Sequence, residues 1–127
     1  MNKNEHKIEK IVTEYIAVAV SDELLDLLIL YRQSDPILET FEDRKLILYI
    51  VNKAIAENTQ ISTKEICLSR SQNIKLRKTP LINQHFESIN NQYKKFGVEV
   101  SSRQYFHRLI LGYLEQHVCI DLQNTTI

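Results

Sequence analysis

Residues 73–79 read Asn-Ile-Lys-Leu-Arg-Lys-Thr and are followed by Pro80. Ile74 and Leu76 alternate with polar side chains, which is the period of a β-strand that has one buried face. The alternation extends back to Glu65, so we expect either one interrupted strand or two short strands within residues 65–79. A lone strand leaves its backbone hydrogen-bonding groups unpaired. We therefore expect this strand to pair with its own copy in a second chain.

Two helices are expected after this strand. Pro80 suits the first turn of a helix, and apolar residues follow it at steps of three and four as far as Phe96. Gly97 is suited to the left-handed conformation that ends many helices, and Ser101 is suited to cap the next one. The second helix would bury Phe106, Leu109, Ile110, Tyr113 and Leu114.

The preceding half of the chain also has helical patterns. We expect an amphipathic helix from Glu5 to Val20, a second helix capped by Ser21, and a third over residues 35–57. Residues 24–31 are apolar nearly all round, which predicts burial on most sides. Two Gly and two Pro among 127 residues also favour helices, and no internal repeat is visible. We predict a mostly α fold, with an N-terminal helical extension (residues 1–64) and a strand–helix–helix domain (residues 65–127).

The charges are divided unequally between the two halves, although the formal net charge is zero. Residues 1–65 carry 12 Asp and Glu against 8 Lys and Arg, whereas residues 66–127 carry 4 against 8. This asymmetry predicts an anion-binding C-terminal half and an acidic N-terminal half that would contact a protein partner.

A strand, a helix ending at Gly97 and a helix that begins Val-Ser-x-x-x-Tyr-Phe-x-Arg-Leu-Ile resemble the ribbon-helix-helix family of DNA-binding proteins, which includes Arc-like and methionine repressor-like proteins. The resemblance covers about residues 72–118. It implies a homodimer whose two strands pair antiparallel and enter the major groove of double-stranded DNA, with higher oligomers possible on the DNA. The family's base-reading positions fall on Asn73, Lys75 and Arg77, and its phosphate contacts on Lys78, Ser101, Ser102 and Arg103.

The chemistry of the strand agrees with this resemblance. Arg and Lys donate to guanine O6 and N7, and Asn can form a bidentate pair with adenine. An alternative interpretation is that Asn73, Lys75 and Arg77 form an ordinary solvated edge that is protected by charge against aggregation. Lys78 would then be plain surface.

Other classes of site lack support in the sequence. His85, His107 and His117 do not have metal-ligand spacing, and there is no phosphate-binding glycine loop or nucleophile signature. We expect no metal, no cofactor and no enzymatic activity. Without an apolar run near 18 residues or a signal-peptide pattern, we expect a cytoplasmic protein with no membrane span.

These patterns together predict a dimeric, sequence-specific DNA-binding transcriptional regulator of a bacterium, phage or plasmid, acting on a two-fold-related site. An accessory DNA-binding protein of a plasmid transfer origin or partition system is the nearest alternative. A helical protein-interaction module without DNA binding is the alternative from a different class.

Overall fold

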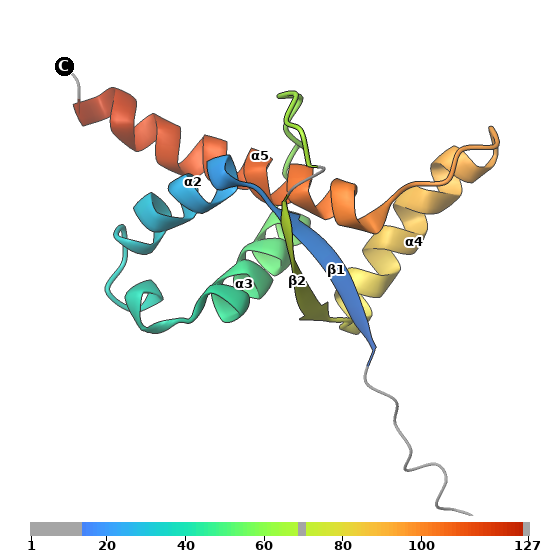
Figure 1. The fold of residues 1–127 in the computed structure, drawn as a ribbon, viewed down its shortest axis with the longest axis horizontal. Coiled ribbons are helices and arrows are strands. Elements are labelled where there is room, and N and C mark those ends of the chain that lie inside the picture. The colour runs from blue at the N-terminus through green and yellow to red at the C-terminus, as the bar shows by residue number, and fades with distance from the viewer. Residues whose placement is uncertain (1–13, 69–70, 126–127) are drawn as a thin grey trace, which may run out of the picture.

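The computed structural model describes residues 14–68 and 71–125, with side chains described as far as Val118. Its elements are β1 (Tyr15–Val20), α2 (Asp22–Arg32), the 3-10 helix η1 (Leu38–Thr40), α3 (Asp43–Ala56), β2 (Gln72–Arg77), α4 (Pro80–Lys94) and α5 (Ser102–Thr125) (Figure 1). The chain is therefore mostly helical, as the sequence predicts, and it carries a two-stranded antiparallel sheet.

The strand partner of β2 is β1 of the same chain, and the two strands form a ribbon with Tyr15 opposite Arg77 and Val20 opposite Gln72. Residues 14–68 and 71–125 contain two strands instead of the predicted one, and the two strands pair within the chain instead of between copies. The helix predicted for residues 5–20 is also wrong over residues 15–20, while residues 5–13 lie outside the described part. Ile16, Val18 and Val20 alternate and are all buried, and β-branched residues suit such a half-buried strand.

Two further boundaries differ from the prediction. The strand expected within residues 65–79 is confined to 72–77, and residues 62–68 run as an irregular segment. The single helix expected over residues 35–57 is divided into η1 and α3, because Phe41 and Glu42 have extended backbone with ψ of 137° and 165°. Three predicted features are confirmed, namely the Ser21 cap, the Ser101 cap and the positive φ of Gly97 (77°).

The two halves of the chain repeat one strand–helix–helix order, β1-α2-α3 and β2-α4-α5. Ser21 and Thr79, 58 residues apart, cap α2 and α4 in the same way, each accepting a hydrogen bond from the backbone N–H three residues later, at 3.1 and 3.2 Å. Those N–H groups belong to Leu24 and Ile82, and both side chains are fully buried. What we predicted as a helical extension is therefore a second unit of the same kind.

The strand register gives the ribbon an approximate two-fold axis. An offset of 58 residues makes Lys75 the equivalent of Ala17, and these two residues pair with each other. The same offset makes Asn73 the equivalent of Tyr15, and Arg77 the equivalent of Ala19. The register pairs Tyr15 with Arg77 and Ala19 with Asn73, so these two pairs are related by a two-fold axis through the Ala17–Lys75 pair. An antiparallel pair in which equivalent positions face each other has two-fold symmetry in its backbone.

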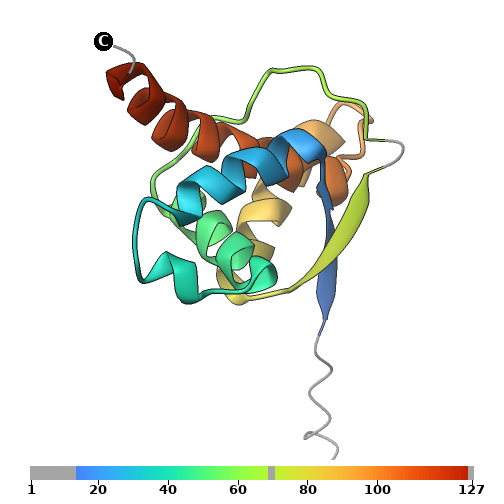
Figure 2. The same cartoon turned by 60° about the vertical axis from the view of Figure 1, so that its left-hand side comes forward.

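The helices follow the same symmetry. α3 buries residues 47, 50, 51 and 54, and α5 buries residues 106, 109, 110 and 113, an equal spacing offset by 59. α5 packs on β1 and α3 on β2, α2 packs on α5 and α4 on α3, and α3 and α5 pack together. Residues from both predicted regions, 1–64 and 65–127, form one hydrophobic cluster. The helices lie on one side of the ribbon, which leaves its other face open (Figure 2).

The apolar helix α2 is buried on one face only. Leu24, Leu28 and Tyr31 are buried, but Ile29 and Leu30 are exposed, so the core of this chain does not bury the helix on most sides. Burial against a second subunit, the other form of the prediction, stays a prediction. Tyr31 donates to or accepts from Tyr113 of α5 through their hydroxyl groups at 2.8 Å, with the rings edge to face. This buried polar contact fixes α2 against α5.

Candidate nucleic-acid interface

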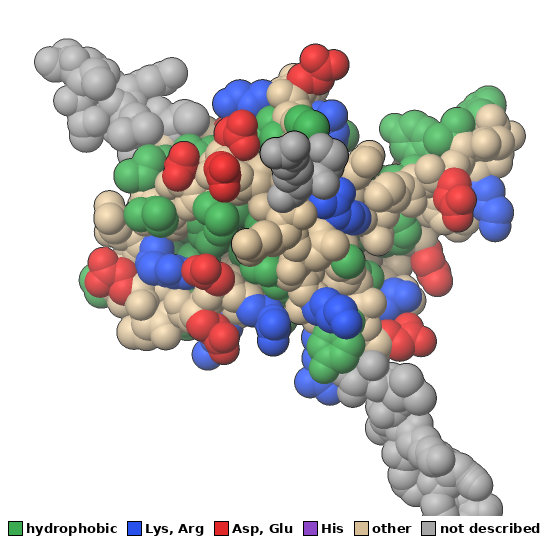
Figure 3. Space-filling model, in the orientation of Figure 1, with side chains coloured by type: hydrophobic (Ala, Val, Ile, Leu, Met, Phe, Trp, Pro, Cys, Tyr) green, Lys and Arg blue, Asp and Glu red, His purple; other side chains and the backbone are tan. Residues whose placement is uncertain are grey.

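The face of the ribbon opposite the core carries three cross-strand pairs, which are Tyr15 with Arg77, Ala17 with Lys75, and Ala19 with Asn73. The three predicted base-reading residues, Asn73, Lys75 and Arg77, are all exposed on this face. Leu76 between them is fully buried, and Ile74 is half-buried against the core. The predicted phase of the strand is therefore confirmed. Lys and Arg side chains lie over the ribbon and near its lower end (Figure 3).

One end of this face is closed by Arg103. Its Nε donates to Asn73 Oδ1 at 2.6 Å, and its Nη2 donates to the carbonyl oxygens of Leu68 and Ser71 at 2.8 and 3.3 Å. Ala19, opposite Asn73, is fully buried. A bidentate contact with adenine needs both the oxygen and the nitrogen of the Asn amide. In this arrangement Arg103 uses one of the two lone pairs of the Asn73 oxygen, so a bidentate contact would have to share that oxygen with Arg103.

The other end of the face is open. Tyr15 is 56% exposed, and Arg77 beside it is also exposed. Lys78, the next residue, lies with its Nζ 3.4 Å from Glu14 Oε1, while its backbone N–H donates to the Glu14 carbonyl oxygen at 2.8 Å. An exposed ion pair of this kind is weak, so a phosphate could compete for Lys78.

The predicted phosphate-binding residues of α5 lie at the closed end. Ser101 is exposed, and its Oγ accepts a hydrogen bond from the Gln104 N–H at 3.3 Å. Ser102 and Arg103 form the first turn, where helix N–H groups have no intrahelical acceptor and favour anions. The contact between Arg103 and Asn73 brings this helix start next to the ribbon.

The equivalent helix start in the first unit carries two carboxylates, although Arg44 and Lys45 follow them in the same turn. The N-cap of α3 is Glu42, which makes no side-chain capping bond, and the first turn contains Asp43. Asp43 forms an ion pair with Arg32 at the end of α2. Carboxylates at this position repel phosphate, so the two helix starts are not equivalent as anion sites.

Sequence reasoning missed Tyr15 and Ala17, which share the outer face with the predicted residues. The signal was present, because residues 15–20 alternate with period two as well as fitting a helical pattern. Reading that segment as a helix removed both residues from consideration.

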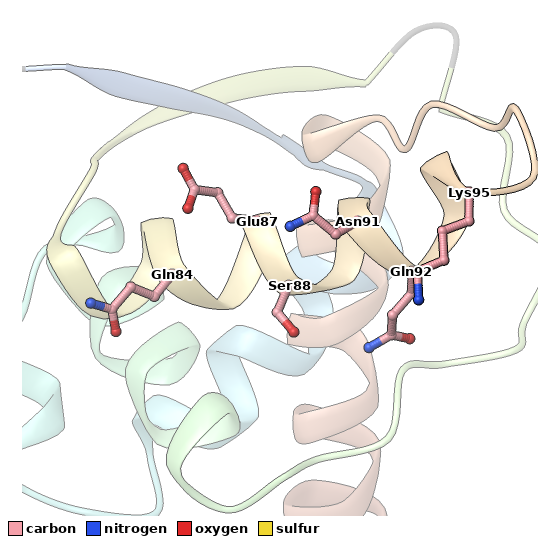
Figure 4. Close-up of a pocket in the computed structure, with 6 residues that line it drawn as sticks. All are labelled: Gln84, Glu87, Ser88, Asn91, Gln92 and Lys95. Carbon is pink, nitrogen blue, oxygen red and sulfur yellow. The ribbon is translucent and has the colours of Figure 1, made fainter.

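One hollow of the surface, of about 310 Å³, lies at the open end of the ribbon beside Glu14 and Lys78, and two larger ones lie along α4. One of the larger hollows, of about 400 Å³, is lined by side chains of α4 and its C-terminal end, as Figure 4 shows: Gln84, Glu87, Ser88, Asn91, Gln92 and Lys95. It is a groove along one helix and not a cleft between elements. Another, of about 430 Å³, lies between α4 and α5 and is lined by apolar residues that include Ile61, Ile89 and Tyr93.

The described residues contain neither a cluster of metal ligands nor a helix that could span a membrane. The described part of the chain holds no group of three or more His, Cys, Asp or Glu placed to bind a metal ion. None of the helices described by the structure combines the length and the hydropathy that a membrane span requires.

No family model, curated protein or solved structure matches this chain. The ribbon-helix-helix resemblance therefore depends on the order of the elements, their caps and the face of the strand.

Proposed function

We propose that the chain is a sequence-specific DNA-binding protein that regulates transcription, with the β1–β2 ribbon lying in the major groove of double-stranded DNA. The observation that supports it most is the row of Asn73, Lys75 and Arg77 on the open face of an antiparallel two-stranded ribbon. A two-stranded ribbon is one of the elements that fit into the major groove of B-DNA.

The opposite face of the ribbon supports the same proposal. Ile16, Val18 and Leu76 are buried in the core, so the packed helices hold the ribbon in place and its outer side chains project from a fixed frame. Lys75 and Arg77 can donate to guanine edges, and Lys78 and the start of α5 lie at opposite ends of β2, where they would meet phosphates on either side.

A gel-shift titration of the full chain against random duplex DNA tests the proposal. We expect binding whose logarithm falls linearly with the logarithm of salt concentration between about 50 and about 200 mM, with a slope near −0.9 per phosphate contact. Absence of any shift at the lowest salt would contradict the proposal and favour a helical interaction module without DNA binding.

A paired set of variants assigns the binding to the ribbon. Lys75→Ala with Arg77→Ala should weaken binding, because it removes two cations from the open face. Lys94→Ala with Lys95→Ala is the matched control, because it removes two exposed cations at the end of α4. Equal losses in both double variants would indicate attraction by total charge and not by the ribbon.

The biological role of such binding depends on where the target sites lie. Mapping of bound sites across the genome should place them at promoters for a transcriptional regulator. Sites confined to a plasmid transfer origin or partition locus would instead support the accessory role.

A further inference from the structure

We infer that one chain reads a DNA sequence that lacks two-fold symmetry, with Tyr15 and Ala17 of β1 as a second set of base-contacting residues. This inference rests on the proposed function, because it concerns the kind of duplex that the same ribbon recognises. It replaces the predicted two-fold-related target of a homodimer.

The ribbon is complete within a single chain. Six residues of β1 pair with six of β2, and each strand is followed by its own capped helix. The buried faces of both strands lie in one hydrophobic cluster. No second copy is needed to form the element that would enter the groove.

The backbone symmetry of the ribbon is not matched by its side chains. At symmetry-related positions the exposed face has Tyr15 where β2 has Asn73, and Ala17 where β2 has Lys75. A homodimer would place Lys75 beside its own copy at the axis, and like charges directly opposite each other are destabilising. The Ala17–Lys75 pair avoids this repulsion.

The two strands therefore offer different contacts to DNA. Lys75 and Arg77 suit guanine O6 and N7, whereas the Ala17 methyl group suits the C5-methyl of thymine. The Tyr15 hydroxyl can donate or accept a hydrogen bond, and its side chain is 56% exposed. We expect a guanine preference on the side of β2 and a thymine preference on the side of β1.

The helix starts add to the difference between the two sides. The start of α5 carries Ser101, Ser102 and Arg103 with no carboxylate, whereas the equivalent start of α3 carries Glu42 and Asp43 together with Arg44 and Lys45. The carboxylates offset the cations of α3, so phosphate is favoured more at the start of α5. Backbone protection should therefore be stronger on the side of the site that faces α5.

Selection of binding sequences from a randomised duplex pool tests the inference, using the full chain and measuring the mass of the complex on a selected site. We expect a motif without two-fold symmetry and one chain per site. A two-fold-symmetric motif bound by two chains would overturn the inference while leaving the proposed function intact. Loss of all binding at low salt would overturn both.

A symmetrising variant sharpens the test. Tyr15→Asn together with Ala17→Lys gives β1 the residues of β2 at two of the three outer-face positions, leaving Ala19 and its equivalent Arg77 different. We expect the selected motif to become more nearly two-fold symmetric. Tyr93→Asn together with Ala56→Lys is the matched control, because both residues are exposed on helices and it should leave the motif unchanged. An unchanged motif in this double variant, with a retained circular dichroism spectrum, would show that β1 does not contact bases.

Discussion

At the scale of single residues, Arg103 has the role that differs most from its prediction. It is the residue through which the start of α5 holds both Asn73 and the segment before β2, by three hydrogen bonds from one guanidinium group. The prediction placed the backbone amide of Arg103 on phosphate and left its side chain as either a further phosphate contact or plain surface, whereas the side chain has a structural role. Its equivalent in the first unit, Arg44, is exposed.

Arg103→Ala should release the end of the irregular segment. Hydrogen bonds to a charged group contribute roughly 1.5–3 kcal/mol each when buried, and less at this half-buried site, so we expect a loss of about 1–2 kcal/mol in the free energy of unfolding. Amide hydrogen exchange should accelerate in residues 64–68. Arg44→Ala is the control, and equal acceleration there in both variants would contradict the assigned role.

His107 predicts a pH dependence of stability. Its Nε2 lies 2.8 Å from Ser21 Oγ, and burial lowers the pKa of His107, helped by Arg108 and Arg103 and opposed by Glu23. His107 therefore takes up a proton more readily in the unfolded chain than in the folded one. The stability that neutral His107 contributes is fully present above its ordinary pKa of 6.5, and it is lost as the pH falls below that value.

We expect the melting temperature to decrease between about pH 7 and about pH 5, and His107→Gln to reduce that decrease. Some dependence should remain, because burial also lowers the pKa of His85. The exposed His117→Gln is the control. A slope in His107→Gln identical to that of the unmodified chain would show that His107 does not carry the effect.

At the scale of elements, the irregular segment after α3 is held against α5. The Ser62 N–H donates to the Arg108 carbonyl oxygen at 2.9 Å, and the Arg108 guanidinium donates to the carbonyl oxygens of Ser62 and Lys64 at 2.9 and 3.1 Å. Gly112 allows this approach, because a Cβ there would lie 3.0 Å from Ser62 N and closer still to the Gln60 carbonyl oxygen.

Gly112→Ala should therefore push this segment away from α5. We expect a cost of about 1–3 kcal/mol in the free energy of unfolding measured with urea, as for overpacking, together with faster exchange of the Ser62 N–H. Gly97→Ala provides the comparison: a Cβ there meets nothing within 4 Å, but the φ of +77° is unfavourable for Ala. It should be destabilising without changing exchange at Ser62, and faster exchange there in both variants would contradict the packing argument.

At the scale of the whole molecule, both strands of the ribbon and both pairs of helices come from one chain. The thermal stability of the DNA-free protein should therefore not depend on its concentration. We expect the same melting temperature over about a hundredfold range of concentration, and a mass in solution near 14.9 kDa. A melting temperature that rises with concentration would show that folding is coupled to association, as in the predicted homodimer.

The sequence by itself determined the second unit in detail. Pro80, Gly97 and Ser101 mark the starts and the end of the helices. They could be recognised from the sequence because their effects act within a few residues. The alternation of Ile74 and Leu76 gave the correct face of β2, so Asn73, Lys75 and Arg77 were placed on the outside correctly. What they bind remains a prediction.

Only the tertiary structure decided the partner of β2 and the second set of outer-face residues. Ile16, Val18 and Val20 fit a helix or a strand by pattern alone, and it is the vacant edge of β2, together with α5 packed on β1, that selects the strand. The repeat was not visible in the sequence because the two units share buried positions and the Ser21 and Thr79 caps, while most equivalent positions carry different amino acids. Strand pairing joins residues about 60 apart in the sequence, and no local pattern encodes which edge a strand will meet.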